Sequence, residues 1–357
     1  MLDSVDVSFE MIPSRHAVFD LRVVEMGYIP PRVRLLRGIK LATILLTGCT
    51  GFIGARLAGE LLNRGHTIYA LTRHTTRRDL STLGDAVESI RFIEADITDY
   101  LSVESAVESC SPQLVVHLAA LTPVRLSFEN PIPYLRVNLL GTSNLVHAVL
   151  ERAPKAKLVV ATSAEVYGWQ PPEPTKETAR LCPSSPYGVS KAAADEYVQM
   201  AMRVYGARAV VLRCNNTYGR IGESGFFTEY VVNSMLHGGP VYVGTPDHVR
   251  DYMYADDHVN AYLMAIESDA SAGNVFNVSP GNPISNLELA NKIAKLVRYS
   301  GKIVEGGYPP GYPRRPTDAD TDYIVLDSSR IRSKLGWKPS VTLEEGLRRT
   351  IEIWKTS

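Results

Sequence analysis

A tyrosine and a lysine four residues apart, Tyr187 and Lys191, are the residues of this sequence best suited to acid/base chemistry. A helix that begins near Pro186 would place both side chains on one face. An ammonium group beside a phenol favours the phenolate, and so lowers a pKa that is otherwise about 10 toward the range of a useful general acid/base. The same spacing also occurs on exposed helix faces. The segment TSAEVYG (162–168) favours the chemical interpretation, because it is expected at the carboxyl end of a strand, where open α/β sheets bind ligands.

A glycine-rich turn, GCTGFIG (48–54), lies between a strand pattern and an amphipathic helix pattern. Glycines at such a turn let the backbone approach a diphosphate, whose charge is favoured by free N–H groups and by the helix N-terminus. The spacing is GxxGxxG, one residue wider at the first gap than the GxGxxG of ordinary dehydrogenases. The strand before the glycines and the helix after them predict a dinucleotide site.

The end of the second expected strand, about 20 residues after the glycines, indicates which dinucleotide binds. A carboxylate there would bind the ribose 2′-hydroxyl of NAD. This chain has Arg73 instead, with Arg77 and Arg78 close behind. A guanidinium suits a 2′-phosphate, so NADP is favoured over NAD as the cofactor. The alternative is that these arginines form only a solvated loop face.

Short β-branched or aliphatic runs alternate with amphipathic stretches from Ala42 onward, which is the pattern of a parallel sheet covered by helices on both faces. A helix after the glycine turn is expected to end at a left-handed cap on Gly65. Further helices are expected at Asn286–Arg298 and Leu343–Lys355, on either side of a surface loop rich in proline and glycine at 301–316. The candidate strands suggest a Rossmann sheet: Thr43–Thr47, Thr67–Leu71, Arg91–Ala95, Leu114–His117, Lys157–Thr162 and Ala207–Arg213.

Composition limits the partners that the protein can have. A length of 357 residues suggests about two domains. Lysine and arginine number 38 and so do aspartate and glutamate, so no overall basic field would attract nucleic acid or an anionic membrane. No apolar run approaches the ~20 residues that span a bilayer. The four cysteines form no CxxC pair and no dense framework, which favours a reducing cytoplasm and no metal site.

Six motifs together resemble those of the extended short-chain dehydrogenases/reductases, the nucleotide-sugar epimerases and dehydratases. They follow the family's order and approximate spacing: TGCTGFIG (47–54), DITD (96–99), HLAA (117–120), TSAEVYG (162–168), YGVSK (187–191) and RDYMYADD (250–257). The resemblance implies an α/β fold, a Rossmann doubly wound parallel sheet with a smaller, discontinuous C-terminal substrate-binding lobe. Residues 41–215, with a returning segment at about 250–280, would form the NAD(P)-binding domain. Residues 216–249 and 281–357 would form the lobe, and residues 1–40 an N-terminal extension of unknown role.

The resemblance also implies roles for single residues. Ser163, Tyr187 and Lys191 match the catalytic hydroxyl, the base and the lysine that lowers its pKa, and Glu165 matches a carboxylate of the dehydratases. The cofactor positions are Gly48, Thr50, Gly51, Phe52, Ile53, Gly54, Arg73, Asp96, Ile97, Leu118, Ala119, Ala120 and Asn138, with Tyr187 and Lys191. The positions that would hold a nucleotide-diphosphate sugar are Asn216, Val241, Tyr242, Arg250 and Arg315. An arginine fork suits phosphate oxygens, although Asn216 would also suit a turn cap, and Arg250 an ion pair with Asp251 or Asp256.

The resemblance implies oxidation at C4 of the sugar as the first step, after which the family's reactions diverge. Glu165 stands two residues after Ser163, where 4,6-dehydratases and UDP-glucuronate decarboxylases carry glutamate, and this favours elimination of water to a 4-keto-6-deoxy sugar. Ala164 fills the place where dTDP-glucose dehydratases have an aspartate acid. GDP-mannose dehydratases manage without that aspartate and resemble this chain in Arg73, but they usually have serine at 164. The alternatives are a 4-epimerase, then a 4-keto reductase or decarboxylase, and then a non-catalytic NADP-binding sensor or an assembly protein.

Family members commonly pair through two long helices of each subunit. The resemblance therefore implies a homodimer held by a four-helix bundle. The candidate helices are those across Pro131–Glu151 and Pro186–Tyr205.

Overall fold

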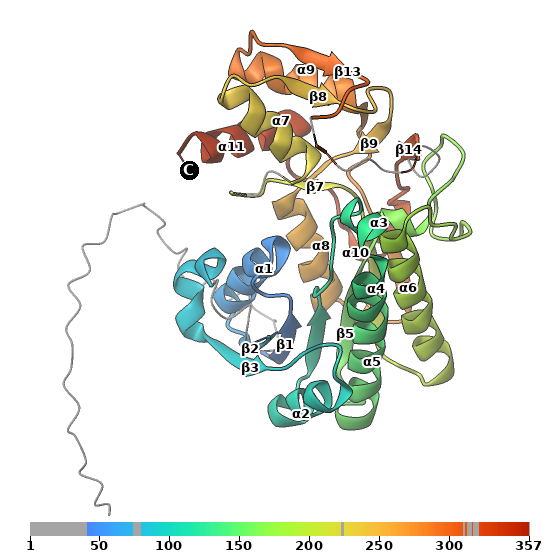
Figure 1. The fold of residues 1–357 in the computed structure, drawn as a ribbon. Helices are drawn as coiled ribbons and strands as arrows, with labels where there is room; N and C mark the ends of the chain where they lie inside the picture. The colour runs from blue at the N-terminus through green and yellow to red at the C-terminus, as the bar shows by residue number, and fades with distance from the viewer. Residues whose placement is uncertain are drawn as a thin grey trace, which may run out of the picture. The chain divides into compact units, whose positions relative to one another are not determined.

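A seven-stranded parallel sheet forms the centre of the structure (Figure 1). The computed structural model describes residues 41–73, 80–222, 225–309, 311–312, 316 and 321–356. Along the sheet the strand order is β11-β6-β5-β4-β1-β2-β3, so the connections reverse direction beside β1, as in a doubly wound Rossmann sheet. The strands are β1 (Thr43–Thr47), β2 (Thr67–Thr72), β3 (Ile90–Glu94), β4 (Leu114–His117), β5 (Lys157–Ser163), β6 (Ala209–Cys214) and β11 (Asn274–Val278). The predicted fold class is confirmed.

The six strands predicted from the sequence are all present, with ends that differ by two residues at most. The largest difference is at β6, which begins at Ala209 because Gly206 has a φ of 67° and turns the chain just before it. The seventh strand, β11, was not predicted. Its sequence NVFNV contains two asparagines that interrupt the apolar run, although all five of its residues are buried beside β6.

Alternate residues of each strand face two different layers of helices. Ile44 and Leu46 of β1 pack in one core cluster with α1 (Phe52–Asn63) and α8 (Ala255–Glu267). Leu45, between them, packs in a second cluster with α2 (Tyr100–Cys110), α5 (Gly141–Arg152) and α6 (Pro186–Val204). Both faces of the sheet are therefore covered, which is why its strands read as continuous apolar runs.

The helices expected from the sequence are present, and their ends follow local signals. Beyond α1, Gly65 adopts a φ of 86°, and its N–H donates to the carbonyl of Leu62 at 2.8 Å. Helix α9 (Asn286–Val297) begins with a capping box between Ser285 and Glu288. The segment expected as one helix across Pro131–Glu151 consists of α4 (Pro131–Tyr134), a π-helical stretch (Leu135–Leu140) and α5.

C-terminal segments build a third core around Val231, Leu289 and Leu347. Between β10 and β12 the chain returns to the central sheet to form α8 and β11. Two further short α-helices are α3 (Leu126–Glu129) and α10 (Ser329–Leu335). The elements of the third core are β7 (Thr217–Tyr218), α7 (Phe227–Leu236), β8 (Val241–Val243), β10 (Met253–Tyr254), β12 (Pro283–Ser285), α9, β13 (Ile303–Glu305) and α11 (Leu343–Thr356). Strand β9 (Val249–Asp251) pairs with β12 and with β14 (Tyr323–Ile324). Across the described ranges, every helix is too short or too polar to cross a bilayer.

Candidate active site

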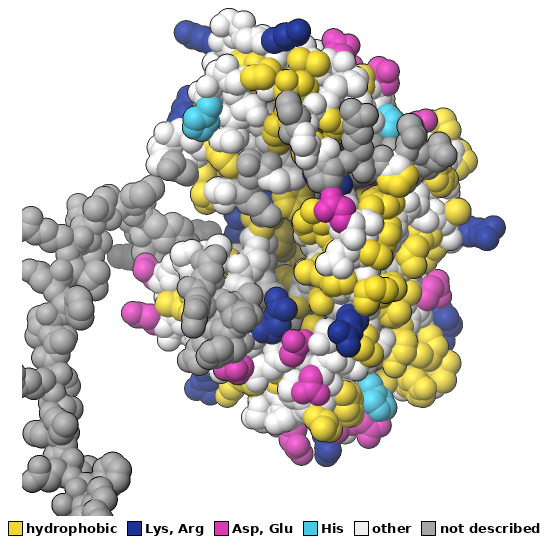
Figure 2. Space-filling model, in the orientation of Figure 1, with side chains coloured by type: hydrophobic (Ala, Val, Ile, Leu, Met, Phe, Trp, Pro, Cys, Tyr) yellow, Lys and Arg dark blue, Asp and Glu magenta, His cyan; other side chains and the backbone are white. Residues whose placement is uncertain are grey.

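One cavity of about 710 Å³ brings together most of the residues that the sequence singled out. It lies at the carboxyl ends of the central strands and reaches residues of α7 and β8, and Figure 2 shows a hollow whose walls are largely hydrophobic. The predicted residues that line it are Gly48, Thr50, Gly51, Phe52, Ile53, Gly54, Arg73, Asp96, Ile97, Leu118, Ala119, Ala120, Ser163, Glu165, Tyr187, Lys191, Asn216, Tyr242 and Arg250. Arg77, Arg78, Arg315 and residues 1–40 lie outside the described residues.

The glycine turn between β1 and α1 packs against the end of β4 without room for side chains. Gly48 has a φ of 74°, and a β-carbon there would lie 2.7 Å from the backbone nitrogen of Ala119. A β-carbon on Gly54 would overlap the carbonyl oxygen of Gly48. Gly51 caps α1, whose first N–H groups have no partner within the helix. These donors, at the positive end of the helix dipole and beside the cavity, fit the diphosphate of a dinucleotide.

A buried chain of hydrogen bonds fixes the loop that follows β4. The Ala119 N–H donates to Thr47 Oγ1 (3.1 Å), which bonds His117 Nδ1 (2.7 Å), and His117 Nε2 bonds Thr142 Oγ1 (2.9 Å). Thr142 in turn donates to the carbonyl of Asn138. Thr142 uses its hydroxyl proton on the Asn138 carbonyl, so its oxygen accepts from His117 Nε2–H. The Thr47 oxygen accepts from the Ala119 N–H, and its proton goes to His117 Nδ1. His117 is therefore neutral, with its proton on Nε2.

Asn138 supports the loop after β4 through hydrogen bonds and does not line the cavity. Its side chain is completely buried, accepts from the Leu121 N–H (2.8 Å), and donates to the Leu121 carbonyl (3.0 Å) and to Ser190 Oγ (2.9 Å). The π-helical stretch between α4 and α5 carries Asn138 at this position. Asn138 therefore does not make the direct cofactor contact that was predicted. It instead supports a loop whose residues line the cavity.

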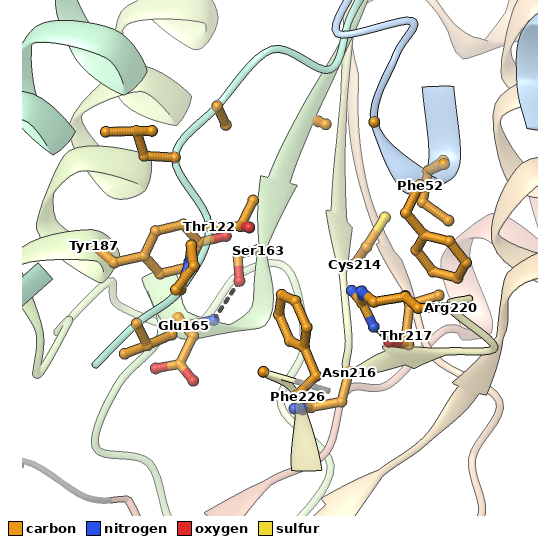
Figure 3. Close-up of a pocket in the computed structure, with 18 of the residues that line it drawn as sticks. Phe52, Thr122, Ser163, Glu165, Tyr187, Cys214, Asn216, Thr217, Arg220 and Phe226 are labelled. Atoms are coloured by element: carbon orange, nitrogen blue, oxygen red, sulfur yellow. Dashed lines mark hydrogen bonds between the residues drawn. The ribbon is translucent and has the colours of Figure 1, made fainter. Parts of the chain in front are cut away.

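Ser163, Glu165 and Tyr187 lie on one wall of the cavity (Figure 3). Ser163 is the last residue of β5, and its Oγ accepts a hydrogen bond from the Glu165 N–H at 3.2 Å, which begins a short 3₁₀ turn. Tyr187 lies in the first turn of α6, a helix capped by Ser185, whose hydroxyl accepts from the Gly188 N–H at 3.0 Å. A strand end and a helix start thus hold a hydroxyl, a carboxylate and a phenol around the same space.

Burial raises the pKa of Tyr187 well above its ordinary value, a hydrogen bond from Ser163 opposes that rise, and the Glu165 carboxylate adds to it. Burial also lowers the pKa of Lys191 to about 8. The Lys191 ammonium donates to the carbonyl of Ala161 at 2.9 Å. The net lowering of the Tyr187 pKa expected from Lys191 is wrong for this structure, because desolvation of the phenol dominates.

Arg73 and Asp96 follow the neighbouring strands β2 and β3 and line the same part of the cavity. Burial by itself would raise the pKa of Asp96. The Thr98 N–H and hydroxyl, each 2.8 Å from Oδ1, together with the charge of Arg73, lower this pKa below its usual value. Asp96 is therefore an ionised acceptor beside an arginine at neutral pH.

The substrate positions predicted from the sequence divide into two groups. Asn216, Tyr242 and Arg250 line the cavity. Arg250 is 7% exposed and donates from Nη1 to the Val249 carbonyl at 2.9 Å. Val241 instead is completely buried in the third core, because side chains alternate along β8 and its neighbour Tyr242 takes the cavity side.

Several cavity residues were not predicted. The Arg220 guanidinium lies 4.5 Å from the ring centre of Phe52 and 3.6 Å from that of Phe226, so it joins the glycine turn to α7. Arg125 lies 3.5 Å from the ring centre of Tyr312. Of these two arginines, Arg220 lies four residues after the predicted substrate residue Asn216, whereas Arg125 lies outside the six motifs.

Comparisons with known proteins agree with this geometry. Residues 45–350 match the model of the family described as GDP-mannose 4,6 dehydratase. The dTDP-glucose 4,6-dehydratase of Salmonella typhimurium is 31% identical, over 87% of this chain and 91% of that protein.

Solved structures with similar folds include members of two enzyme classes. The UDP-glucose 4-epimerase of Thermotoga maritima, solved with UDP-glucose, has a TM-score of 0.79 and 29% identity over 88% of this chain and 99% of that one. The dTDP-glucose 4,6-dehydratase DesIV of Streptomyces venezuelae, solved with NAD and TYD, has a TM-score of 0.77 and 25% identity over 88% of this chain and 97% of that one. With a family match across most of its length, the chain belongs to the GDP-mannose 4,6-dehydratase family of nucleotide-sugar epimerases and dehydratases, among the extended short-chain dehydrogenases/reductases.

Proposed function

We propose that the protein is an NAD(P)-dependent nucleotide-sugar 4,6-dehydratase that converts its substrate to a 4-keto-6-deoxy sugar. The observation that carries this proposal is Glu165. Its carboxylate lines the cavity that Tyr187 also lines, it is held on the turn capped by Ser163, and its charge acts on the Tyr187 phenol. Dehydration needs a carboxylate near the reacting carbons, and a 4-epimerase does not.

Tyr187 and Ser163 perform the first half of the proposed reaction. Tyr187 removes the proton of the C4 hydroxyl, and Ser163, within hydrogen-bonding reach of that phenol, orients the hydroxyl. A dinucleotide held by the glycine turn and Arg73 would supply hydride transfer to and from the sugar. Lys191, from the next turn of α6, fits the role of holding the dinucleotide in place, since its ammonium lines the same cavity.

Glu165 performs the second half. The C4 ketone acidifies the hydrogen on C5, and Glu165 removes it as a proton. Position 164 is alanine, so the proton on Glu165 is the one available to the departing C6 hydroxyl, which leaves as water. A proton from solvent adds to C5, Tyr187 releases the proton that it took, and C6 would receive the hydride that the dinucleotide carries. The sum is loss of one water from the sugar.

A 4-epimerase is the second candidate, and a specific observation favours it. Ala164 is 3% exposed and lines the cavity, so it offers no acid to a leaving group. The similarity to the Thermotoga maritima epimerase is as high as that to DesIV. In this case the ketone would turn over and accept hydride on its other face, and Glu165 would have no chemical role.

The cofactor is proposed to be NADP, with NAD as the alternative. Arg73 is exposed at the end of β2 and lines the cavity, where a guanidinium suits a 2′-phosphate. DesIV, which was solved with NAD, supports the alternative. Fluorescence titration with NADPH and NADH decides between them: tighter NADPH binding that is lost in Arg73→Ala supports NADP, and tighter NADH binding in the unaltered chain contradicts it.

We also infer a homodimer formed through α4, α5 and α6. Ile132, Leu140, Val189 and Val204, on these helices and the π-helical stretch, are 44–65% exposed, which is unusual for aliphatic side chains on a lone helix face. Helices α5 and α6 pack side by side (Figure 1). Sedimentation at micromolar concentration is expected to show a dimer that Val204→Arg weakens. A monomer of the unaltered chain would contradict the inference.

The reaction is tested by incubating the protein and a cofactor with GDP-mannose, dTDP-glucose, UDP-glucose and UDP-N-acetylglucosamine. Dehydration gives 4-keto products, detected by their absorbance in alkali, and epimerisation gives C4 epimers, separated by chromatography. No conversion of any of the four would contradict an enzyme of this kind.

A further inference from the structure

A buried histidine lines the cavity with one ring nitrogen that has no hydrogen-bond partner among the described residues. His258 lies in the first turn of α8 and is 8% exposed. Its Nδ1 is 2.8 Å from Thr217 Oγ1, whereas its Nε2 is buried and unpaired. A buried polar atom without a partner is unfavourable, and most such atoms in folded proteins are paired.

The ring of His258 is fixed in place on two sides. It stacks on Tyr262 with 5.2 Å between ring centres, and the Tyr262 hydroxyl lies 3.9 Å from Cys214 Sγ, another cavity residue. The bond to Thr217 fixes the rotation of the ring about its own axis. Figure 3 shows Thr217 and Cys214 on the wall opposite Ser163 and Tyr187. The position of Nε2 is therefore set before any ligand binds.

The hydrogen bonds of Thr217 determine what His258 Nε2 can bind. The Thr217 hydroxyl has one proton and donates it to the Asn215 carbonyl at 3.1 Å. Thr217 Oγ1 therefore accepts from His258 Nδ1–H, and Nε2 is left as a lone-pair acceptor. Burial, with the charge of Arg220, lowers the pKa of His258 to about 3, so the ring stays neutral. A neutral acceptor cannot pair with phosphate oxygens and requires an N–H or O–H donor.

We propose that His258 Nε2 accepts a hydrogen bond directly from an amide or hydroxyl group of the nucleotides bound in the cavity, an inference that rests on the proposed function. Two sources carry this chemistry. The nicotinamide end of the dinucleotide has a carboxamide N–H and ribose hydroxyls, and the sugar nucleotide has sugar and ribose hydroxyls. His258 is thereby a binding residue on α8, directly after the RDYMYADD motif.

Two substitutions separate the two ring nitrogens. His258→Asn retains a polar atom near Nδ1, which faces Thr217, and removes the one at Nε2. His258→Gln places a polar atom near Nε2 and loses the one at Nδ1. His66→Asn is the matched control, because His66 is also buried with unpaired ring nitrogens but does not line the cavity. Thermal unfolding of each purified full-length variant identifies the folded ones.

The readout is the dissociation constant of NADH, from fluorescence titration, and of dTDP-glucose and UDP-glucose, from calorimetry with NADH present. His258→Asn is expected to weaken one of these ligands about 5–10-fold, as for loss of one hydrogen bond, with His258→Gln closer to the unaltered chain and His66→Asn unchanged. Weaker NADH identifies the dinucleotide as the donor, and weaker sugar nucleotide alone identifies the substrate.

The proposal is overturned if both His258 variants bind all ligands normally, or if His258→Asn binds better than His258→Gln, since the ring would then act only through Thr217. If the unaltered chain binds neither NADH nor any sugar nucleotide, the proposed function fails and this inference fails with it. Normal binding by the unaltered chain separates the two failures.

Discussion

The hydroxyl of Ser163, the last residue of β5, acts on the phenol of Tyr187 in the first turn of α6. Burial raises the pKa of Tyr187, and the Ser163 hydroxyl opposes that rise. Removing the hydroxyl in Ser163→Ala is therefore expected to raise this pKa and to move the rising limb of kcat/KM to higher pH. The measurement is the pH profile of both proteins. A limb at the same pH in Ser163→Ala would show that Tyr187 is not the group that limits the rate there.

Tyr187→Phe removes the acid/base group and little else, because the phenylalanine ring fills the same space. Activity on any accepted sugar nucleotide is expected to fall by about 10²–10⁴-fold. The thermal unfolding temperature should stay near that of the unaltered chain, since the Tyr187 N–H, not its hydroxyl, bonds Ser127 Oγ at 3.1 Å. Full activity in this variant would remove Tyr187 from the mechanism.

A buried ion pair connects α6, which carries Tyr187 and Lys191, to β6. Arg213 donates to both carboxylate oxygens of Asp195 at 2.8 Å, and the side chains of Arg213 and Asp195 are 3% and 0% exposed. Asp195→Asn leaves a buried guanidinium without its counter-charge, and is expected to lower the free energy of unfolding by about 3–5 kcal/mol in urea denaturation.

The control for this pair is Glu344→Gln, which breaks the surface pair with Arg348 on α11. Its side chain is 67% exposed, so the expected loss is below about 0.5 kcal/mol. If both variants lost the same free energy of unfolding, the buried pair would stabilise the protein no more than the surface pair does.

The neutral state of His117 predicts how stability depends on pH. Burial lowers its pKa from 6.5 to about 3, with a smaller effect of Lys191. The unfolded chain therefore binds a proton that the folded chain does not between these values. The contribution of neutral His117 to the free energy of unfolding is complete above about pH 6.5, and it is lost progressively as the pH falls toward 3.

The measurement is the free energy of unfolding at pH 7 and pH 5 for the unaltered chain and for His117→Gln. The unaltered chain should lose stability over this interval, and the variant, although less stable at pH 7, should lose less of it. His147→Gln is the control, because His147 is exposed on α5 and its substitution should leave the slope unchanged. An identical slope in His117→Gln would contradict the account of the buried chain around His117.

The sheet and the glycine turn were predictable because their determinants are local. Runs such as TILLT (43–47) specify a buried strand. Gly48 and Gly54 are required wherever the turn from strand to helix packs this closely against neighbouring backbone. Strand β11 was missed because its asparagines make sense only once β6 lies beside it: the Asn277 side chain is completely buried and bonds the Tyr167 hydroxyl.

Cavity-lining residues were predictable from the sequence only where they belong to a motif. Asn138 and Val241 occupy the expected places along the chain, but a π-helical stretch and the alternation along β8 turn their side chains away from the cavity. Arg220 and Phe226 meet the Phe52 ring through contacts between distant segments, which no local spacing encodes. The unpaired nitrogen of His258 likewise depends on where Thr217 falls in the fold.

The central claim is that Glu165 is the base at C5 of the sugar, and Glu165→Gln tests it most directly. The expected result, on whichever sugar nucleotide is converted, is loss of water elimination and of solvent deuterium incorporation at C5. Glu173→Gln, an exposed carboxylate in the loop after β5, should behave as the unaltered chain. If Glu165→Gln forms the 4-keto-6-deoxy product at the unaltered rate, or if the only product of the unaltered chain is a C4 epimer, the dehydratase account is contradicted.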